Sequence, residues 1–277
     1  MNTSLHSLIQ ACKELGVDYK TYHTTQNVVE LRPNDKSYVF INWTTPLNAH
    51  AVSQLCLDKT FFYTFFQDSI NMPQTVGFLD PRCEQKYSKY LTEKNYQEIV
   101  TAIENQFQYP LIIKKNRGSL GHFVFHVKNR QAILSAIESI FNPNGKESDY
   151  VALVQDYIDI KTEYRAICLN GALIFAYEKN IDHAIYEDNL SPLHCQGTKA
   201  IVVHDKPLLN QIERFCSPLF QKMMIPFCGL DVVIDKQGVW WLIEANSSPG
   251  FKYIIRDCGQ REVINLYKKM VLYLARS

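Results

Sequence analysis

The side chains best suited to chemistry lie near the C-terminal end, in a predicted hairpin of strands 228–234 and 239–245. Asp231 and Glu244 interrupt these apolar strands, where an unpaired buried carboxylate costs free energy. In a hairpin both can lie on one face, and Asn246, two residues after Glu244, points the same way. Two carboxylates and an amide oxygen form a cluster suited to Mg2+ bridging phosphates. The alternative is that they are polar groups at strand ends near solvent.

A second candidate is the loop Lys114-Lys-Asn-Arg-Gly118-Ser119-Leu-Gly121, between two apolar strands. Its glycines and serine can turn backbone N–H groups toward an anion, and Lys114 adds the positive charge that phosphate oxygens attract. The GxxxxGK[ST] and GxGxxG patterns are absent, and a strand follows the loop, so it is no P-loop. The pattern indicates a flap that covers phosphate, with an ordinary hairpin turn as the alternative.

Two further segments carry polar groups on predicted strands. Residues 150–158 contain Gln155-Asp156-Tyr157-Ile158, and an extended strand there offers backbone groups that can imitate base pairing to adenine. An ordinary core strand is the alternative. Glu163 and Arg165 share one strand face by alternation, and Lys179 ends the hairpin partner; a cross-strand ion pair is the simple explanation.

The elements that must position these groups follow from hydrophobic periodicity and from capping residues. Asn170-Gly171 predicts a two-residue hairpin, Gly16 a helix end and Asn95 a helix start. Helices are predicted over residues 5–15, 48–66, 95–107, 129–141, 207–224 and 260–275, and further strands over 17–23, 38–42, 111–115, 122–127, 163–169 and 172–178. The predicted fold class is α+β. We expect three lobes, residues 1–58, 59–149 and 150–277, with the middle one on hinges.

Composition excludes several classes of protein. The chain has 277 residues, 46% of them hydrophobic, and a formal net charge of +1, which is typical of a folded globular protein and favours no nucleic-acid partner. Its apolar runs are shorter than the roughly 20 residues of a membrane span, and no export signal is visible in residues 1–15. The eight cysteines lie far apart without a CxxC pair, which predicts reduced thiols and a cytoplasmic protein.

The order of these parts resembles the ATP-grasp superfamily, and within it the RimK-like carboxylate–amine ligases, over roughly residues 48–255. The resemblance implies two α+β lobes on either side of ATP, preceded by a short N-terminal α/β lobe. It implies that Lys59 and Lys114 contact the phosphates and that Gly118, Ser119 and Gly121 belong to a loop over the terminal phosphate. Adenine would be contacted by Gln155, Asp156, Tyr157 and Ile158, and the ribose by Glu163. Arg165 and Lys179 would face the acyl intermediate, and the metal ligands would be Asp231, Glu244 and Asn246.

The resemblance also implies a reaction. A substrate carboxylate attacks the γ-phosphate of ATP, an acylphosphate and ADP form, and an amine then displaces phosphate to give an amide. The implied cofactors are ATP and two Mg2+ ions, with Mn2+ as an alternative, and the implied partners are small-molecule or peptide carboxylates and amines. Ser119, Arg165 and Lys179 would serve the chemistry. A kinase of small molecules and a nucleotide-binding regulator without turnover are the alternatives.

Three departures bear on these expectations. Phe123 stands where relatives commonly have a third glycine, and Glu187-Asp-Asn189 occupies a region where they carry Arg-x-Asn. Only 58 residues precede Lys59, fewer than the N-terminal lobe of relatives uses. We therefore expect an acceptor pocket that is incomplete in one chain or completed by a second subunit in a homodimer.

Overall fold

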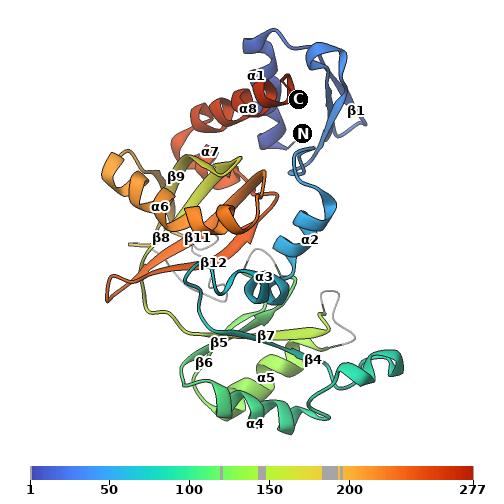
Figure 1. Cartoon of the computed structure of the whole chain (residues 1–277), viewed down its shortest axis with the longest axis vertical. Helices are drawn as coiled ribbons and strands as arrows, with labels where there is room; N and C mark the ends of the chain where they lie inside the picture. Colours follow the sequence, from blue (N-terminus) through green and yellow to red (C-terminus); the bar gives the residue numbers. More distant parts are fainter. Residues whose placement is uncertain (1, 119–120, 143–147, 183–192, 194–195, 277) are drawn as a thin grey trace.

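The computed structural model describes residues 2–118, 121–142, 148–182, 193 and 196–276 of the chain. It contains three antiparallel sheets and the helices that cover them, as Figure 1 shows. The α+β class predicted from the sequence is confirmed. No helix in the described ranges is both long and apolar enough to cross a membrane.

The N-terminal region combines one helix with a small sheet in the order β1-β2-β3. Helix α1 ends at Gly16, whose φ of 66° is the left-handed conformation expected there. Leu5 and Leu8 on α1 are fully buried in a core that also contains Val271 of the last helix, α8. Figure 1 accordingly shows both termini at the same end of the molecule. The elements are α1 (Thr3–Leu15), β1 (Tyr19–Tyr22), β2 (Val28–Leu31), a 3-10 turn (Pro33–Asp35), β3 (Tyr38–Ile41) and α8 (Arg261–Leu274).

Two helices connect this region to the middle of the chain. We expected one helix over residues 48–66, and this was wrong: α2 (His50–Leu57) and α3 (Lys59–Phe66) are separate. Asp58 lies between them with extended backbone angles, and its Oδ1 accepts a hydrogen bond from Phe61 N–H at 3.0 Å. Asp58 therefore caps a new helix, which places Lys59 at its first position.

The middle lobe is a four-stranded sheet, in the order β4-β7-β5-β6, with α4 and α5 packed against it. Asn95 and Asn129 cap the two helices with their side chains. We expected residues 150–158 to open the C-terminal lobe; instead β7 pairs with β4 and β5 inside this sheet. The elements are β4 (Thr75–Leu79), a 3-10 turn (Gln85–Tyr90), α4 (Tyr96–Gln106), β5 (Leu111–Lys115), β6 (Val124–Val127), α5 (Arg130–Ile140) and β7 (Val151–Asp156).

The C-terminal lobe is a five-stranded sheet in the order β10-β9-β8-β11-β12. Asn170 and Gly171 have φ of 50° and 78°, as the predicted two-residue hairpin requires. Even-numbered positions of β8, such as Ala166, pack toward α6, and Ile167 and Leu169 pack toward the core around α1 and α8. The elements are β8 (Ile160–Leu169), β9 (Ala172–Asn180), β10 (Lys199–Val202), α6 (Lys206–Lys222), β11 (Phe227–Asp235), β12 (Trp240–Asn246) and α7 (Lys252–Cys258).

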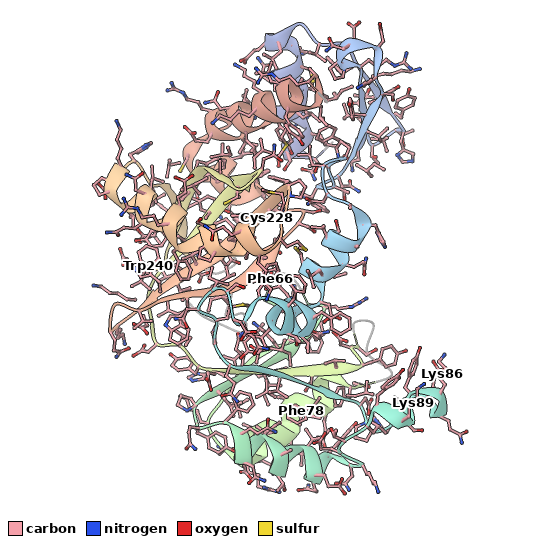
Figure 2. All side chains as sticks on the ribbon, in the orientation of Figure 1. Phe66, Phe78, Lys86, Lys89, Cys228 and Trp240 are labelled. Carbon is pink, nitrogen blue, oxygen red and sulfur yellow. The ribbon has the colours of Figure 1, made fainter. Side chains whose placement is uncertain are left out.

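Both faces of this sheet are thus covered over most of its area. Figure 2 shows Cys228 inside the C-terminal lobe, Phe78 inside the middle lobe and Phe66 near the border between them, where it packs into the core that contains Cys228. Glu163 and Arg165 alternate onto the same face of β8 as Ile167 and Leu169, which the core around α1 covers. At Glu163 and Arg165 this face instead borders a cleft. The cleft lies where this face of the sheet extends beyond the core around α1 and approaches the middle lobe.

Candidate functional site

A cleft of about 1090 Å³ lies between the four-stranded and five-stranded sheets. The site residues predicted from the sequence converge on it, with one lying outside the described residues, Ser119. The predicted residues that line the cleft are Lys59, Lys114, Gly118, Gly121, Gln155, Asp156, Tyr157, Ile158, Glu163, Arg165, Lys179, Asp231, Glu244 and Asn246. They come from both lobes and from α3, so the fold brings together groups that are far apart in the sequence.

Two lysines enter the cleft from the side of the middle lobe. Lys59 Nζ donates to the carbonyl oxygen of Gly118 at 2.7 Å and lies 3.6 Å from Glu244 Oε2. Lys114 is 6% exposed and its Nζ donates to Gln155 Oε1 at 2.9 Å. Burial, assisted by the nearby charge of Lys59, lowers the pKa of Lys114 to about 8. Two ammonium groups close enough to affect each other are an arrangement suited to a polyanion.

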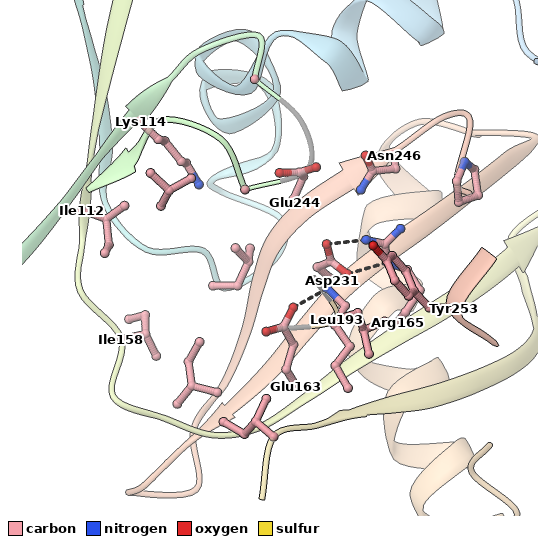
Figure 3. A pocket seen from close by; sticks show the side chains of 18 of the residues that line it. Ile112, Lys114, Ile158, Glu163, Arg165, Leu193, Asp231, Glu244, Asn246 and Tyr253 are labelled. Atoms are coloured by element: carbon pink, nitrogen blue, oxygen red, sulfur yellow. Dashed lines mark hydrogen bonds and ion pairs between the residues drawn. The ribbon is translucent and has the colours of Figure 1, made fainter. Parts of the chain in front are cut away.

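Opposite the lysines lies a buried ionic network on β8, β9 and β11. Asp231 is directly across from Arg165 in the sheet, and its carboxylate accepts from Arg165 Nε at 2.5 Å and Nη2 at 2.8 Å. Lys179 Nζ lies 2.8 Å from Asp231 Oδ1 and also pairs with Glu163. Figure 3 shows Glu163, Arg165 and Asp231 side by side on the sheet. The cross-strand ion pair considered from the sequence is therefore present, between Lys179 and Glu163.

The network fixes the charges of its members. Burial alone would raise the pKa of Asp231, but Arg165 and Lys179 outweigh it and lower that pKa. Burial likewise disfavours the charged form of Lys179, yet Asp231 and Glu163 raise its pKa. Asp231 and Lys179 are therefore both charged at neutral pH. Removing one partner from a buried pair leaves an uncompensated charge and costs roughly 3–5 kcal/mol.

The oxygen donors predicted to bind metal lie on one face of the sheet. Asp231 is paired with Glu244 across β11 and β12, and Gly229, two residues from Asp231, is paired with Asn246. Asn246 Nδ2 is buried without a hydrogen-bond partner, so this amide has a polar group that the described protein atoms leave unsatisfied. In the described ranges no group of three or more His, Cys, Asp or Glu is arranged to hold a metal. Asp231, Glu244 and Asn246 fit a hard cation such as Mg2+ only if oxygen atoms of a bound molecule complete the coordination shell of the ion.

The opposite end of the cleft is apolar and aromatic. Tyr157 stacks on His126, with ring centroids 4.5 Å apart and planes 15° apart. His126 pairs with Ile112 across β5 and β6, and Ile112 also faces Gln155 of β7. The sequence analysis missed His126 and Ile112. Strand alternation could have indicated Ile112, because it shares a strand face with Lys114, which faces the cleft, whereas Leu111 and Ile113 lie in the core.

The loop between β5 and β6 has backbone features that suit a turn over a ligand. Gly121 has a φ of 74°, and Phe123 has a φ of 55°, a conformation that is uncommon for a residue with a large side chain. Lys115 Nζ lies 4.6 Å from the centre of the Phe123 ring. Phe123, where the resemblance suggests glycine, thus adopts a glycine-like backbone conformation. Glu187 and Asn189, the other departure, lie outside the described residues.

Comparison with known proteins identifies a family and several relatives of the chain. A family model described as a RimK-like ATP-grasp domain matches residues 84–274, which is more than half of the chain. A D-alanine–D-alanine ligase B of Clostridium perfringens is 22% identical over 167 residues, covering 59% of this chain and 52% of the ligase. The chain spans about half the length of the curated relatives it matches.

Solved structures share the fold at low sequence identity. A D-alanine–D-alanine ligase from Bacillus anthracis matches with a TM-score of 0.57 and 16% identity, covering 83% of this chain and 71% of that one. A bifunctional glutathione synthetase from Pasteurella multocida matches with a TM-score of 0.56 and 15% identity, covering 98% of this chain and 44% of that one. Likeness at this identity shows the fold.

Proposed function

Because the chain belongs to the RimK-like ATP-grasp family, whose fold binds ATP, we propose that it is an ATP- and Mg2+-dependent carboxylate–amine ligase. In this proposal the chain joins a small-molecule or peptide carboxylate to an amine through an acylphosphate, with formation of ADP and phosphate. The domain boundaries 1–58, 59–149 and 150–277 stay predictions, except that β7 belongs to the middle sheet.

One observation carries the proposal. Lys59 and Lys114 face a cleft whose opposite wall carries Asp231, Glu244 and Asn246, and an apolar end adjoins it. A nucleotide has the same order of chemical parts: an apolar base, a ribose and a chain of anionic phosphates. Tyr157 and Ile158 then contact adenine, Glu163 the ribose, and the two lysines the phosphates.

The charges of the cleft suit the proposed reaction. The attack of a carboxylate on a phosphoryl group brings two anions together, so nearby cations lower the barrier. Lys59 and Lys114 neutralise the phosphates from one side, while Arg165 and Lys179 neutralise the acyl intermediate from the other. Gly118, Ser119 and Gly121 supply backbone and hydroxyl donors to the terminal phosphate. No covalent bond to the protein forms at any step.

Asp231, Glu244 and Asn246 are the residues that would hold the metal. Bound there, Mg2+ or Mn2+ would supply charge neutralisation for the phosphates of ATP. In the structure both oxygens of Asp231 interact with Arg165 and Lys179. A carboxylate has about four acceptor sites and these three contacts use most of them, so about one site remains for a cation.

The setting of the protein belongs to the same proposal. We place it in the cytoplasm, because the proposed reaction consumes ATP, which the cytoplasm supplies. The cysteines within the described ranges are free thiols, which is typical of a reducing compartment. A second subunit that completes the acceptor pocket stays a prediction from the sequence.

Product analysis tests the function. The protein is incubated with Mg·ATP and pools of amino acids and other small carboxylates and amines, while ADP and inorganic phosphate are measured separately. We expect both products to appear together, and only when a carboxylate and an amine are present. Glu244→Gln should abolish turnover, whereas Glu262→Gln on α8, which does not line the cleft, should leave it unchanged.

Two alternatives give different products. A kinase would release ADP while phosphate stays on the acceptor. A regulator would bind ATP and release neither product. The contacts of Arg165 and Lys179 with the Asp231 carboxylate, which occupy both of its oxygens, favour a regulator as the second candidate. If the protein binds ATP but releases neither ADP nor phosphate in any pool, the regulator replaces the ligase as the proposed function.

A further inference from the structure

The cleft continues past the predicted metal residues. Strand β12 ends at Asn246, and the segment that follows it also lines the cleft. In the sheet Glu163 lies on one side of the Arg165–Asp231 pair, and Gly229 and Asn246 lie on the other. The cleft therefore has an end remote from the adenine-facing residues. We call it the outer end and define it by Trp43, Ser248, Pro249, Gly250, Lys252 and Tyr253.

Trp43 reaches the outer end from the N-terminal region. It lies in a tight turn closed by two backbone hydrogen bonds, from Ile41 N–H to Thr44 O at 3.1 Å and from Thr44 N–H to Ile41 O at 2.8 Å. Its side chain is 51% exposed. A Cβ atom added at Gly250 would lie 3.6 Å from the indole Nε1, so the indole packs over the Gly250 backbone. A large aromatic surface is thus presented by a hydrogen-bonded turn at the rim of the cleft.

Asn48 fixes this turn relative to the rest of the site. Its Nδ2 donates to Phe227 O at 2.7 Å and to Ser247 O at 3.1 Å, and its Oδ1 accepts from Phe227 N–H at 3.0 Å. These bonds tie the segment that follows Trp43 to the start of β11 and to the loop after β12. A preorganised aromatic surface binds a ligand with a smaller loss of conformational entropy than a mobile one.

The outer end has a positive electrostatic character. Lys252 is its charged member, and its Nζ lies 5.6 Å from the centre of the Tyr253 ring. Arg256 lies over the same ring at 5.0 Å, but Asp257 pairs with its guanidinium, so the positive charge of this end comes from Lys252. Arg165 lies nearer the centre of the cleft. The negative charge of its neighbour Asp231 is neutralised by ion pairs with Arg165 and Lys179. An anion is attracted to this end, and an ammonium group is repelled from it.

We propose that the outer end binds the carboxylate substrate and that this substrate carries a flat apolar ring, with Trp43 as the specificity-determining residue. The inference rests on the proposed ligase function and names its substrate class. The ring stacks on the indole, and the carboxylate lies toward Arg165, where the acylphosphate forms. A flat ring suits this wall because aromatic rings gain stability from stacking beyond the area they bury.

Calorimetric binding in the presence of Mg·ADP tests this without turnover. The probes are 3-phenylpropionate, cyclohexanepropionate, which has the same charge but no flat ring, and phenethylamine, which has the ring but a positive charge. The native protein should bind 3-phenylpropionate most tightly. Trp43→Ala should weaken its binding about tenfold, and Trp43→Phe should stay within about threefold of the native protein. Lys252→Gln should reduce the preference for the acid over the amine.

A matched control is Val39→Ala, an exposed residue on the strand that precedes the turn and outside the cleft lining. It should bind every probe as the native protein does, and Mg·ADP affinity should be the same in all variants. Equal binding of 3-phenylpropionate by Trp43→Ala and the native protein, or tighter binding of the amine, would overturn the proposal. So would binding of Mg·ADP with no binding of either acid, although the ligase function would then stand. Failure to bind Mg·ADP would remove both.

Discussion

At the scale of single residues, the proposed contact of Lys114 with phosphate predicts that ATP binding is sensitive to pH. Its pKa of about 8 in the free protein means that the ammonium is protonated below that pH and neutral above it. Phosphates favour the charged form, so above about pH 8 binding must take up a proton. The dissociation constant for ATP should therefore rise above this pH, by at most about tenfold per pH unit.

The matched variant is Lys114→Met, which keeps the apolar stem and removes the charge. Its ATP affinity should be low throughout and should not change between pH 7.5 and 9.5, as followed by calorimetry over roughly this window. A wild-type affinity that is constant over the same window would show that Lys114 does not contact the phosphates.

Arg165 should serve chemistry more than nucleotide binding. Its guanidinium is bound by Asp231 on the far side of the cleft from Lys59 and Lys114, where the acyl group is proposed to form. Arg165→Ala should lower kcat about 100-fold or more, the usual cost of losing one transition-state donor, with little change in ATP affinity. Arg165→Lys should recover part of the loss, because it keeps the charge without the bidentate geometry. Steady-state kinetics and direct ATP titration would separate the two effects, and an equal loss of affinity would place Arg165 at the nucleotide.

The types of the site residues could be predicted from the sequence, but their partners could not. Alternation placed Glu163 and Arg165 on one face, and they do share it. Asp231 lies 66 positions after Arg165, and only the register of β8 against β11 makes them neighbours. His126 was missed for the same reason, since it reaches the cleft through its pairing with Ile112.

At the scale of elements, Asn48 connects the N-terminal turn to the hairpin of β11 and β12. Asn48→Ala leaves the Phe227 N–H and two carbonyl groups without this partner, so the free energy of unfolding should fall by about 1–3 kcal/mol. Asn48→Asp keeps the acceptor for Phe227 N–H and loses both donors, so it tests the donated bonds separately. Urea denaturation measures both. A change below about 0.5 kcal/mol for Asn48→Ala would contradict this role.

Helices with caps were predictable, whereas elements shaped by distant contacts were not. Residues 95–107 and 129–141 were predicted from periodicity and match α4 and α5 closely. Strand β4 was missed because Gly77 interrupts its pattern. A Cβ at Gly77 would lie 2.7 Å from Thr60 Oγ1 on α3, so the glycine serves a tertiary contact. The short elements β2, β10 and α7 were missed as well, since a few residues carry little periodicity.

At the scale of the whole molecule, the chain contains separate cores that should unfold separately. Leu8 of α1 is buried with residues of α8 and of the five-stranded sheet, while Ile137 of α5 belongs to the middle-lobe core. Leu8→Ala and Ile137→Ala should each cost about 2–5 kcal/mol. Hydrogen exchange should accelerate in α8 and β9 for the first variant and in α4 and β5 for the second. Equal acceleration in both lobes for either variant would show a single cooperative unit.

The same arrangement explains why the cleft lies between lobes. Lys59 bridges them, since it donates to Gly118 on the middle lobe and lies near Glu244 on the C-terminal lobe. A polyanion bound there would contact cations from the middle-lobe side and, through a divalent cation, carboxylates from the other. Nucleotide binding should therefore couple the two lobes.

The transfer of a carboxylate oxygen tests the central claim most directly. If the carboxylate attacks the γ-phosphorus, one of its oxygens becomes bonded to phosphorus and leaves with phosphate when the amine attacks the carbonyl carbon. With a substrate labelled with oxygen-18 in both carboxylate oxygens, mass spectrometry should find one labelled oxygen in each phosphate released. Unlabelled phosphate accompanying amide formation would contradict an acylphosphate intermediate, and with it the account of this cleft.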